Sequence, residues 1–146
     1  MNFELVTLDG VKSQGQVYSV VLPTASGQIT VLPGHEPLLS QLVPGVITVR
    51  RTKGDPDHHL EHFATFGGVV EIRAQSVRVL VDEAASSEEV NEAEARKAHE
   101  EALRMRKEAK NQVELEHAQS LIDRSAVRLQ IADLKRRHLV LRTDGC

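Results

Sequence analysis

Residues 77–90 read VRVLVDEAASSEEV, and the hydrophobic pattern changes its period within this stretch. Val77, Val79 and Val81 alternate with other residues, which is the period of a β-strand that buries one face. The following segment SSEE, at 86–89, is typical of a helix start, because serine caps free amide groups and acidic side chains favour the helix dipole. The stretch therefore predicts a boundary between two domains, residues 1–84 and residues 85–146.

Turn-forming residues lie almost entirely before this boundary. All five prolines and eight of the nine glycines precede Val69, whereas residues 69–144 contain neither. Between the turns lie short segments rich in β-branched residues, which favour strands. These segments are residues 17–22, 28–32, 45–51, 60–66, 69–73 and 77–81. Their spacing predicts an antiparallel sandwich or barrel, with Gly67 and Gly68 in a tight turn or a bulge.

After the boundary, small apolar residues recur at alternating spacings of three and four. The first series is Ala95, Ala98, Ala102, Met105 and Ala109, and the second is Leu115, Ala118, Ile122, Ser125, Leu129 and Ala132. Two such seams predict two helices that face each other as an antiparallel hairpin, so the fold class is α+β. Alanine buries little apolar area, and we therefore expect the hairpin to be the less stable part.

Composition excludes several classes of function. The net charge of −3 argues against nucleic acid as the main partner, and only four aromatic residues leave almost no stacking surface for bases or sugars. No apolar run is long enough to span a bilayer, and the first residues do not resemble a secretory signal. Cys146 is the single cysteine, so neither a disulfide framework nor a multi-cysteine metal site is expected.

The most metal-like stretch is DPDHHLEH, at residues 55–62. On a strand, His58 and His62 would share one face and His59 would lie opposite, but such residues are more typical of a solvated hairpin tip. The glycine patterns of nucleotide-binding loops and of nucleophile elbows do not occur. We expect no metal, no cofactor and no catalytic residue, and hence no enzyme that acts alone.

Two further features suit contacts with a partner. In SGQITVLPGHEPLL, residues 26–39, a strand ends at a Pro-Gly turn, and His35 follows on an exposed loop that could make a docking contact. The second helix carries a series of basic residues, namely Arg124, Arg128, Lys135, Arg136 and Arg137. This pattern alone leaves open a solvated face and a contact with an acidic or phosphate-bearing partner.

The segment LPGHEPLL, at 32–39, resembles the epsilon chain of bacterial F-type ATP synthase. Matching motifs follow in the order of that family: Pro44-Gly45, GGVVEI at 67–72 and VRVLVDEA at 77–84. The resemblance extends from Phe3 to about Arg137. It implies a sandwich of about ten strands in a non-catalytic rotor subunit of the central stalk, which couples proton translocation to ATP synthesis. It also implies attachment to the gamma chain and the c-ring, at the cytoplasmic face of the plasma membrane and only through the complex.

The resemblance implies three sets of functional residues. The rotor interface would comprise Gln28, Leu32, Pro33, Gly34, His35, Pro37 and Leu38. When the hairpin extends, the five basic residues would contact acidic surface on the catalytic beta chains and restrain ATP hydrolysis. Some family members bind ATP on the folded hairpin; this chain keeps Arg124 and Arg128 for that role. In residues 90–95, however, only Ala95 of the family motif is unchanged, and Glu94 would repel a triphosphate.

Two other classes of protein remain as alternatives. A stand-alone β-sandwich binding module with a coiled-coil tail would carry aromatic residues at a face or rim of the sandwich, and this chain has few to offer. A small metal-dependent enzyme would use the cluster between His58 and His62.

Overall fold

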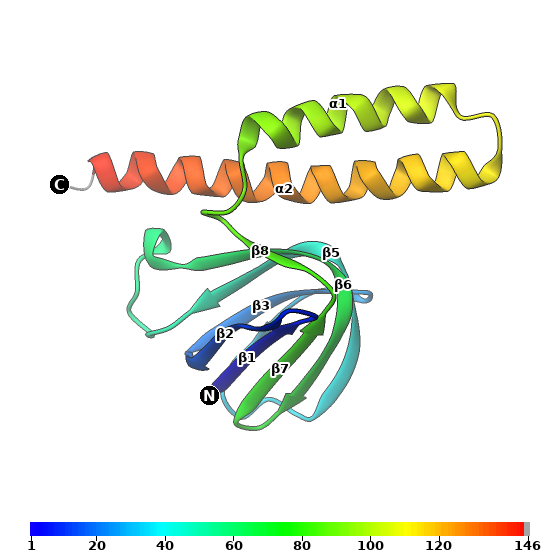
Figure 1. Ribbon diagram of the computed structural model, residues 1–146. Helices are drawn as coiled ribbons and strands as arrows, with labels where there is room; N and C mark the ends of the chain where they lie inside the picture. Colours follow the sequence, from blue (N-terminus) through cyan, green and yellow to red (C-terminus); the bar gives the residue numbers. More distant parts are fainter. Residues whose placement is uncertain (145–146) are drawn as a thin grey trace.

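The computed structural model describes residues 1–144, and the side chains of residues 1–137. A strongly curved β-sheet forms one part, and two helices lie side by side along it, with α2 nearer the sheet than α1 (Figure 1). The strands are β1 (Asn2–Thr7), β2 (Gly10–Gln16), β3 (Ser19–Thr24), β4 (Gly27–Val31), β5 (Leu38–Arg50), β6 (Glu61–Arg73), β7 (Ser76–Val81) and β8 (Ala84–Ser86). The helices are α1 (Glu92–Glu108) and α2 (Gln112–Asp144), and a short 3-10 helix, η1, spans Asp57–His59. The expected α+β class, with strands followed by a helix pair, is confirmed.

The strands form a single sheet that folds over on itself. Their order is β2-β1-β7-β6-β5-β3-β4, and β8 pairs with the first half of β6. The strand pairs are antiparallel except β1 with β7, which run parallel. Because β5 and β6 are 13 residues long each, their two halves have different neighbours, and the curved sheet encloses a core like that of a sandwich.

The interior of the curved sheet is aliphatic. Its fully buried side chains include Phe3, Leu5, Leu22, Ile47, Val70 and Ile72. The alternation predicted for β7 is confirmed, since Val77, Val79 and Val81 are at most 5% exposed whereas Leu80 is 41% exposed.

Gly67 and Gly68 lie inside a continuous strand, so the predicted turn or bulge is wrong. The two segments expected as separate strands, 60–66 and 69–73, belong to the same β6, and its register with β5 is unbroken across the glycines. Both glycines have positive φ, 113° and 154°, which lets the strand bend between its two halves. A Cβ atom at Gly68 would lie only 2.3 Å from the carbonyl oxygen of Leu80.

The described residues form eight strands, where the resemblance implied about ten. The sequence patterns did not identify β1, β2 or β8. Strand β2 is an edge strand whose residues are mostly exposed or half-buried, so it lacks an apolar alternation. Its pairing is reinforced from the side by Arg51, which donates to the Gln14 carbonyl (3.1 Å) and to the Ser13 hydroxyl (2.9 Å).

The first helix begins later than predicted. Asn91 is its N-cap, and the side-chain oxygen of Asn91 accepts the Glu94 amide at 3.1 Å. The segment at 86–89, predicted as the helix start, instead begins with the last residue of β8, Ser86, which pairs with Phe63 of β6. Pairing with a neighbouring strand has outweighed the local signal for a cap.

The two helices pack as the predicted hairpin, with differences in detail. Ala95 and Ala102 of α1 are buried, as are Ala118, Ile122, Ser125 and Ala132 of α2. Ala98 and Leu115 were expected in the seam but are exposed. Beside Ala98, the ring nitrogen Nδ1 of His99 lies 2.9 Å from Ser125 Oγ. The helical period of 3.6 residues rotates the buried stripe away from a strict heptad, which explains the shift.

We predict that Gly68→Ala destabilises the sheet by about 2–4 kcal/mol, because the new methyl group meets backbone at a positive φ. Chemical denaturation measures this loss. Gly54→Ala is the matched control, since a Cβ atom there meets nothing within 4 Å and φ is not positive. Equal stability of the two variants would contradict the role assigned to Gly68.

Candidate functional site

A small apolar cluster joins α2 to the sheet. Val127 and Ile131, one helical turn apart, pack with Ala64 of β6 and with Val90, and Phe66 borders the cluster. Ile131 and Ala64 are fully buried. The cluster is separate from the main core inside the sheet and has far fewer members. The hairpin is therefore attached to the sandwich by a limited apolar contact.

Polar contacts border this cluster on one side. Glu83, in the link between β7 and β8, bonds Arg124 through one carboxylate oxygen and Arg128 through the other, the latter at 3.2 Å. Both guanidinium groups also lie over the Phe66 ring, with their carbon atoms 4.6 and 5.3 Å from the ring centre. Two cations thus share one carboxylate and one aromatic face, which combines ion pairing with cation–π attraction.

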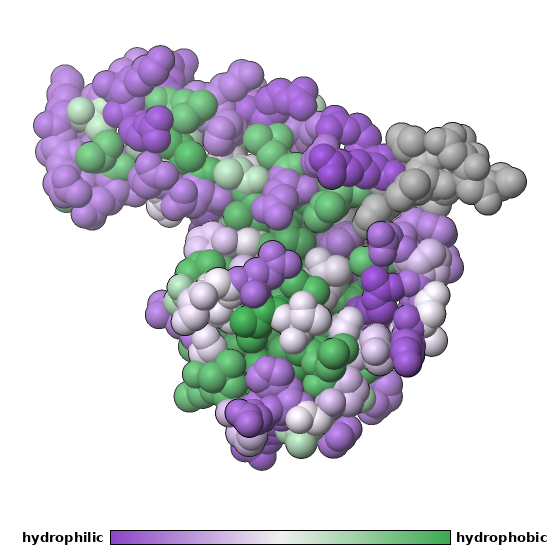
Figure 2. Space-filling model, turned by 180° about the vertical axis from the view of Figure 1, so that it is seen from behind, coloured by the Kyte–Doolittle hydropathy of each residue, from purple (hydrophilic) through white to green (hydrophobic). Residues whose placement is uncertain are grey.

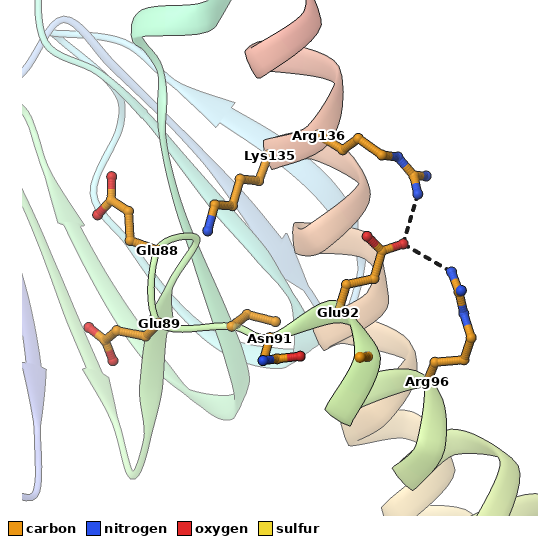
Figure 3. Close-up of a pocket in the computed structure, with 9 residues that line it drawn as sticks. Glu88, Glu89, Asn91, Glu92, Arg96, Lys135 and Arg136 are labelled. Carbon is orange, nitrogen blue, oxygen red and sulfur yellow. Dashed lines mark hydrogen bonds and ion pairs between the residues drawn. The ribbon is translucent and has the colours of Figure 1, made fainter.

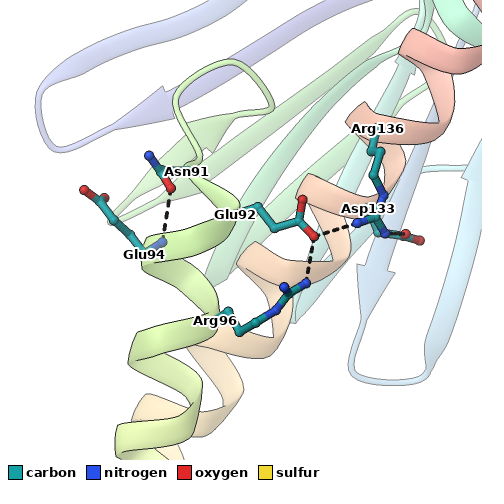
Figure 4. A network of polar contacts seen from close by, with 6 residues as sticks. All are labelled: Asn91, Glu92, Glu94, Arg96, Asp133 and Arg136. Atoms are coloured by element: carbon teal, nitrogen blue, oxygen red, sulfur yellow. Dashed lines mark hydrogen bonds and ion pairs between the residues drawn. The ribbon is translucent and has the colours of Figure 1, made fainter.

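The other three of the predicted basic residues, Lys135, Arg136 and Arg137, lie at the base of the hairpin, where α1 begins. Arg136 donates to Glu92, the first residue of α1, at 2.8 Å and to Asp133 at 2.6 Å (Figure 4). Hydrogen bonding to Asp133 and attraction to Glu92 raise the pKa of Arg136. Arg137 pairs with the same Asp133 at 3.0 Å. The contacts to Asp133 lie within α2, whereas Arg136 and Glu92 join the two helices.

An open hollow lies where the hairpin meets the sandwich (Figure 3). Lys135 extends into it, between the pair Glu88 and Glu89 on one side and Glu92 on the other. The ammonium group of Lys12 bonds Glu89 and lowers the pKa of that carboxyl. Acidic and basic groups alternate around this hollow, so it does not present a surface of one charge to an ion.

Most of the residues predicted for the rotor interface, Leu32 to Leu38, lie at the end of the sandwich away from the helices, whereas Gln28 lies next to the β3–β4 turn at the other end of β4 (Figure 1). Gln28 is in β4, Leu38 begins β5, and the others form the loop between these strands. The Gly34 amide donates to the Ala74 carbonyl at 2.7 Å, which ties the loop to the turn between β6 and β7. His35 is only half-buried, and its Nδ1 lies 2.6 Å from the Glu36 carbonyl.

Sequence patterns did not assign an interface role to several apolar residues that are exposed on the sandwich. Leu39 is 73% exposed, Val69 and Leu80 are more than 40% exposed, and Val69 is the partner of Leu80 across β6 and β7. Seen from behind, hydrophobic side chains gather on the sandwich, whereas the hairpin is mostly hydrophilic (Figure 2). Leu80 lies opposite the buried valines of β7, as the predicted alternation requires, but the sequence did not assign it a place in the interface.

His58, His59 and His62 do not lie on one strand, which was the arrangement considered from the sequence. Asp57–His59 form η1, so His58 and His62 do not alternate along one strand. His62 is 5% exposed, with Nδ1 3.0 Å from Thr48 Oγ1. Among the described side chains, no group of three His, Cys, Asp or Glu residues could hold a metal ion.

Cys146 lies outside the described residues. Within the described part of the chain, neither helix is long and apolar enough to cross a membrane.

Known proteins resemble the chain in both sequence and fold. The family model for the ATP synthase delta/epsilon chain, β-sandwich domain, matches residues 1–87. The ATP synthase epsilon chains of Xanthomonas oryzae pv. oryzae (strain MAFF 311018) and Xanthomonas campestris pv. campestris (strain B100) are 33% and 34% identical over 136 residues. Each alignment covers 93% of this chain and 94% of the relative.

Two solved structures share the fold. A chain of the Euglena gracilis mitochondrial ATP synthase, OSCP/F1/c-ring, aligns with a TM-score of 0.77 and 23% identity, covering 89% of this chain and 79% of that one. A chain of the central stalk and c-ring of the Tetrahymena thermophila enzyme gives a TM-score of 0.57 and 16% identity, covering 89% and 94%. With a family model over most of the chain and relatives a third identical over nearly all of it, the chain belongs to the ATP synthase epsilon chain family.

Proposed function

We propose that this epsilon chain is a non-catalytic part of the central stalk, which couples proton translocation to ATP synthesis and restrains ATP hydrolysis through its hairpin. The proposal rests on the fact that the two ends of the sandwich differ. One end of the sandwich presents exposed apolar side chains, and the hairpin is attached at the other end by a small contact. The complex would place the chain at the cytoplasmic face of the bacterial plasma membrane.

The sandwich is the part proposed to bind the gamma chain and the c-ring. Its loop between β4 and β5 is held by backbone hydrogen bonds, so a partner would meet a preformed surface. Exposed Leu32, Leu38 and Leu39 provide apolar area at this end, as expected for the centre of a protein interface. We also propose that the sandwich and the hairpin are separate folding domains, because the main core contains no residue of either helix.

The hairpin is the part proposed to restrain hydrolysis. In the compact form Arg124, Arg128, Arg136 and Arg137 bond carboxylates of the same chain, through Glu83, Glu92 and Asp133. These pairs are about half-exposed and individually weak. An extended hairpin could exchange them for acidic residues of the catalytic beta chains. Binding of a nucleotide phosphate at Arg124 and Arg128 stays a prediction, and it would have to displace Glu83.

We predict that Leu39→Glu weakens binding to a purified complex of the gamma chain and the c-ring by at least about tenfold, because the charge would be buried without a partner. Titration calorimetry or surface plasmon resonance measures the affinity. Val113→Glu is the matched control, since Val113 is 77% exposed but lies on α2. Unchanged affinity of Leu39→Glu would exclude this surface as the docking site.

A second prediction concerns the base of the hairpin. Replacing Lys135, Arg136 and Arg137 by Ala should weaken the restraint of hydrolysis severalfold at low salt, and added salt should reduce the restraint by the wild-type chain. The measurement is ATP hydrolysis by the reconstituted catalytic head with the chain bound. Replacing Arg104, Arg106 and Lys107 of α1 removes the same charge and is the control. If both triple variants restrain hydrolysis like the wild type, the three residues of α2 form only a solvated face.

A further inference from the structure

Glu83 has an unusual position for a carboxylate that bonds two arginines. It belongs to neither helix but to the link between β7 and β8, which is part of the sandwich. Each of its two oxygens is used by a different residue of α2, Arg124 or Arg128. The contact therefore joins the sandwich to the hairpin, whereas the bonds of Arg136 and Arg137 stay within the hairpin.

We infer that Glu83 is a latch: an internal competitor that holds Arg124 and Arg128 on the sandwich and so limits how often the hairpin extends. The inference rests on the proposed function, in which an acidic partner attracts the same helix. Glu83 would then set the threshold for release, because an incoming acidic group must displace it from both arginines.

The local charges make this latch reversible. One carboxylate neutralises only half of the charge of two guanidinium groups, so the site keeps an attraction for further negative charge. The three side chains are also 36–46% exposed, which allows solvent and salt to weaken the pairs. Phe66 holds both guanidinium groups close to Glu83 through cation–π contact, and so it orders the cations without adding a negative charge.

The latch differs from the apolar contact that also holds the hairpin. Val127 and Ile131 bury area against the sheet, and that attraction is nearly independent of salt. The contribution of Glu83 should disappear at high ionic strength. Salt dependence therefore separates the latch from the remaining attachment of α2.

Glu83→Gln tests the inference, because it removes the charge and keeps the shape. The matched control is Asp82→Asn, which removes the same charge from the adjacent exposed residue. Both changes are made in a chain with Cys146→Ser and spin labels at Lys53 and Gln130, two exposed positions on the sandwich and on α2. Pulsed electron spin resonance then gives the fraction of molecules with the docked distance, and circular dichroism shows whether each variant is folded.

We expect Glu83→Gln to raise the ratio of undocked to docked hairpins roughly three- to tenfold at low salt. The difference from the wild type should vanish at 1 M salt, and Asp82→Asn should match the wild type throughout. A docked fraction for Glu83→Gln equal to that of the wild type at low salt would overturn the latch.

The reconstituted catalytic head supplies a second, independent measurement. There Glu83→Gln should restrain ATP hydrolysis more strongly than the wild type. If the labelled chain undocks as expected but neither chain restrains hydrolysis, the latch stands and the proposed function of the hairpin fails. If the Glu83→Gln hairpin undocks but this variant and the wild type restrain ATP hydrolysis equally, Glu83 does not limit extension of the hairpin in the complex. That result would overturn this part of the inference.

Discussion

The packing of α2 on β6 is the contact on which the rest of the arrangement depends. Val127 and Ile131 bury against Ala64, a residue whose small side chain lets the helix approach the strand. Nearly everything else that joins the two parts is polar and partly exposed. A small apolar contact with weak ion pairs at its border favours one position of the hairpin without making that position permanent, and this balance allows two conformations to differ by little in free energy.

Much of the fold was predictable because its strongest signals are periodic. The alternation of Val77, Val79 and Val81 and the small-residue seams of the helices both follow from which face is buried. The errors arose where a distant partner decided the outcome. Gly67 and Gly68 bend a strand whose two halves pair with β7 and β8, and Ser86 pairs with β6 although serine is a good helix cap. The conformational preferences of neighbouring residues in the sequence do not reveal which distant strand a segment will pair with.

The candidate site shows the same limit. Five of the basic residues of α2, from Arg124 to Arg137, were identified from the sequence, which left a solvated face and an acidic partner as alternatives. The structure adds a third role, since Arg124 and Arg128 bond a carboxylate of the same chain that lies 41 and 45 positions away. Glu83 itself carried no signal, because one acidic residue in a short link is ordinary until the fold places two arginines beside it.

The most direct test of this account locks α2 onto the sheet. Cysteines are introduced at Ala64 and Val127, which belong to the same apolar cluster, in a chain with Cys146→Ser, and mass spectrometry identifies the oxidised chains in which the two are joined. ATP hydrolysis by the reconstituted catalytic head is then measured with the chain bound, before and after reduction. The account predicts that the oxidised chain does not restrain hydrolysis and that reduction restores the restraint. Equal restraint by the oxidised and reduced chains would show that the hairpin acts without leaving the sandwich, which contradicts the account.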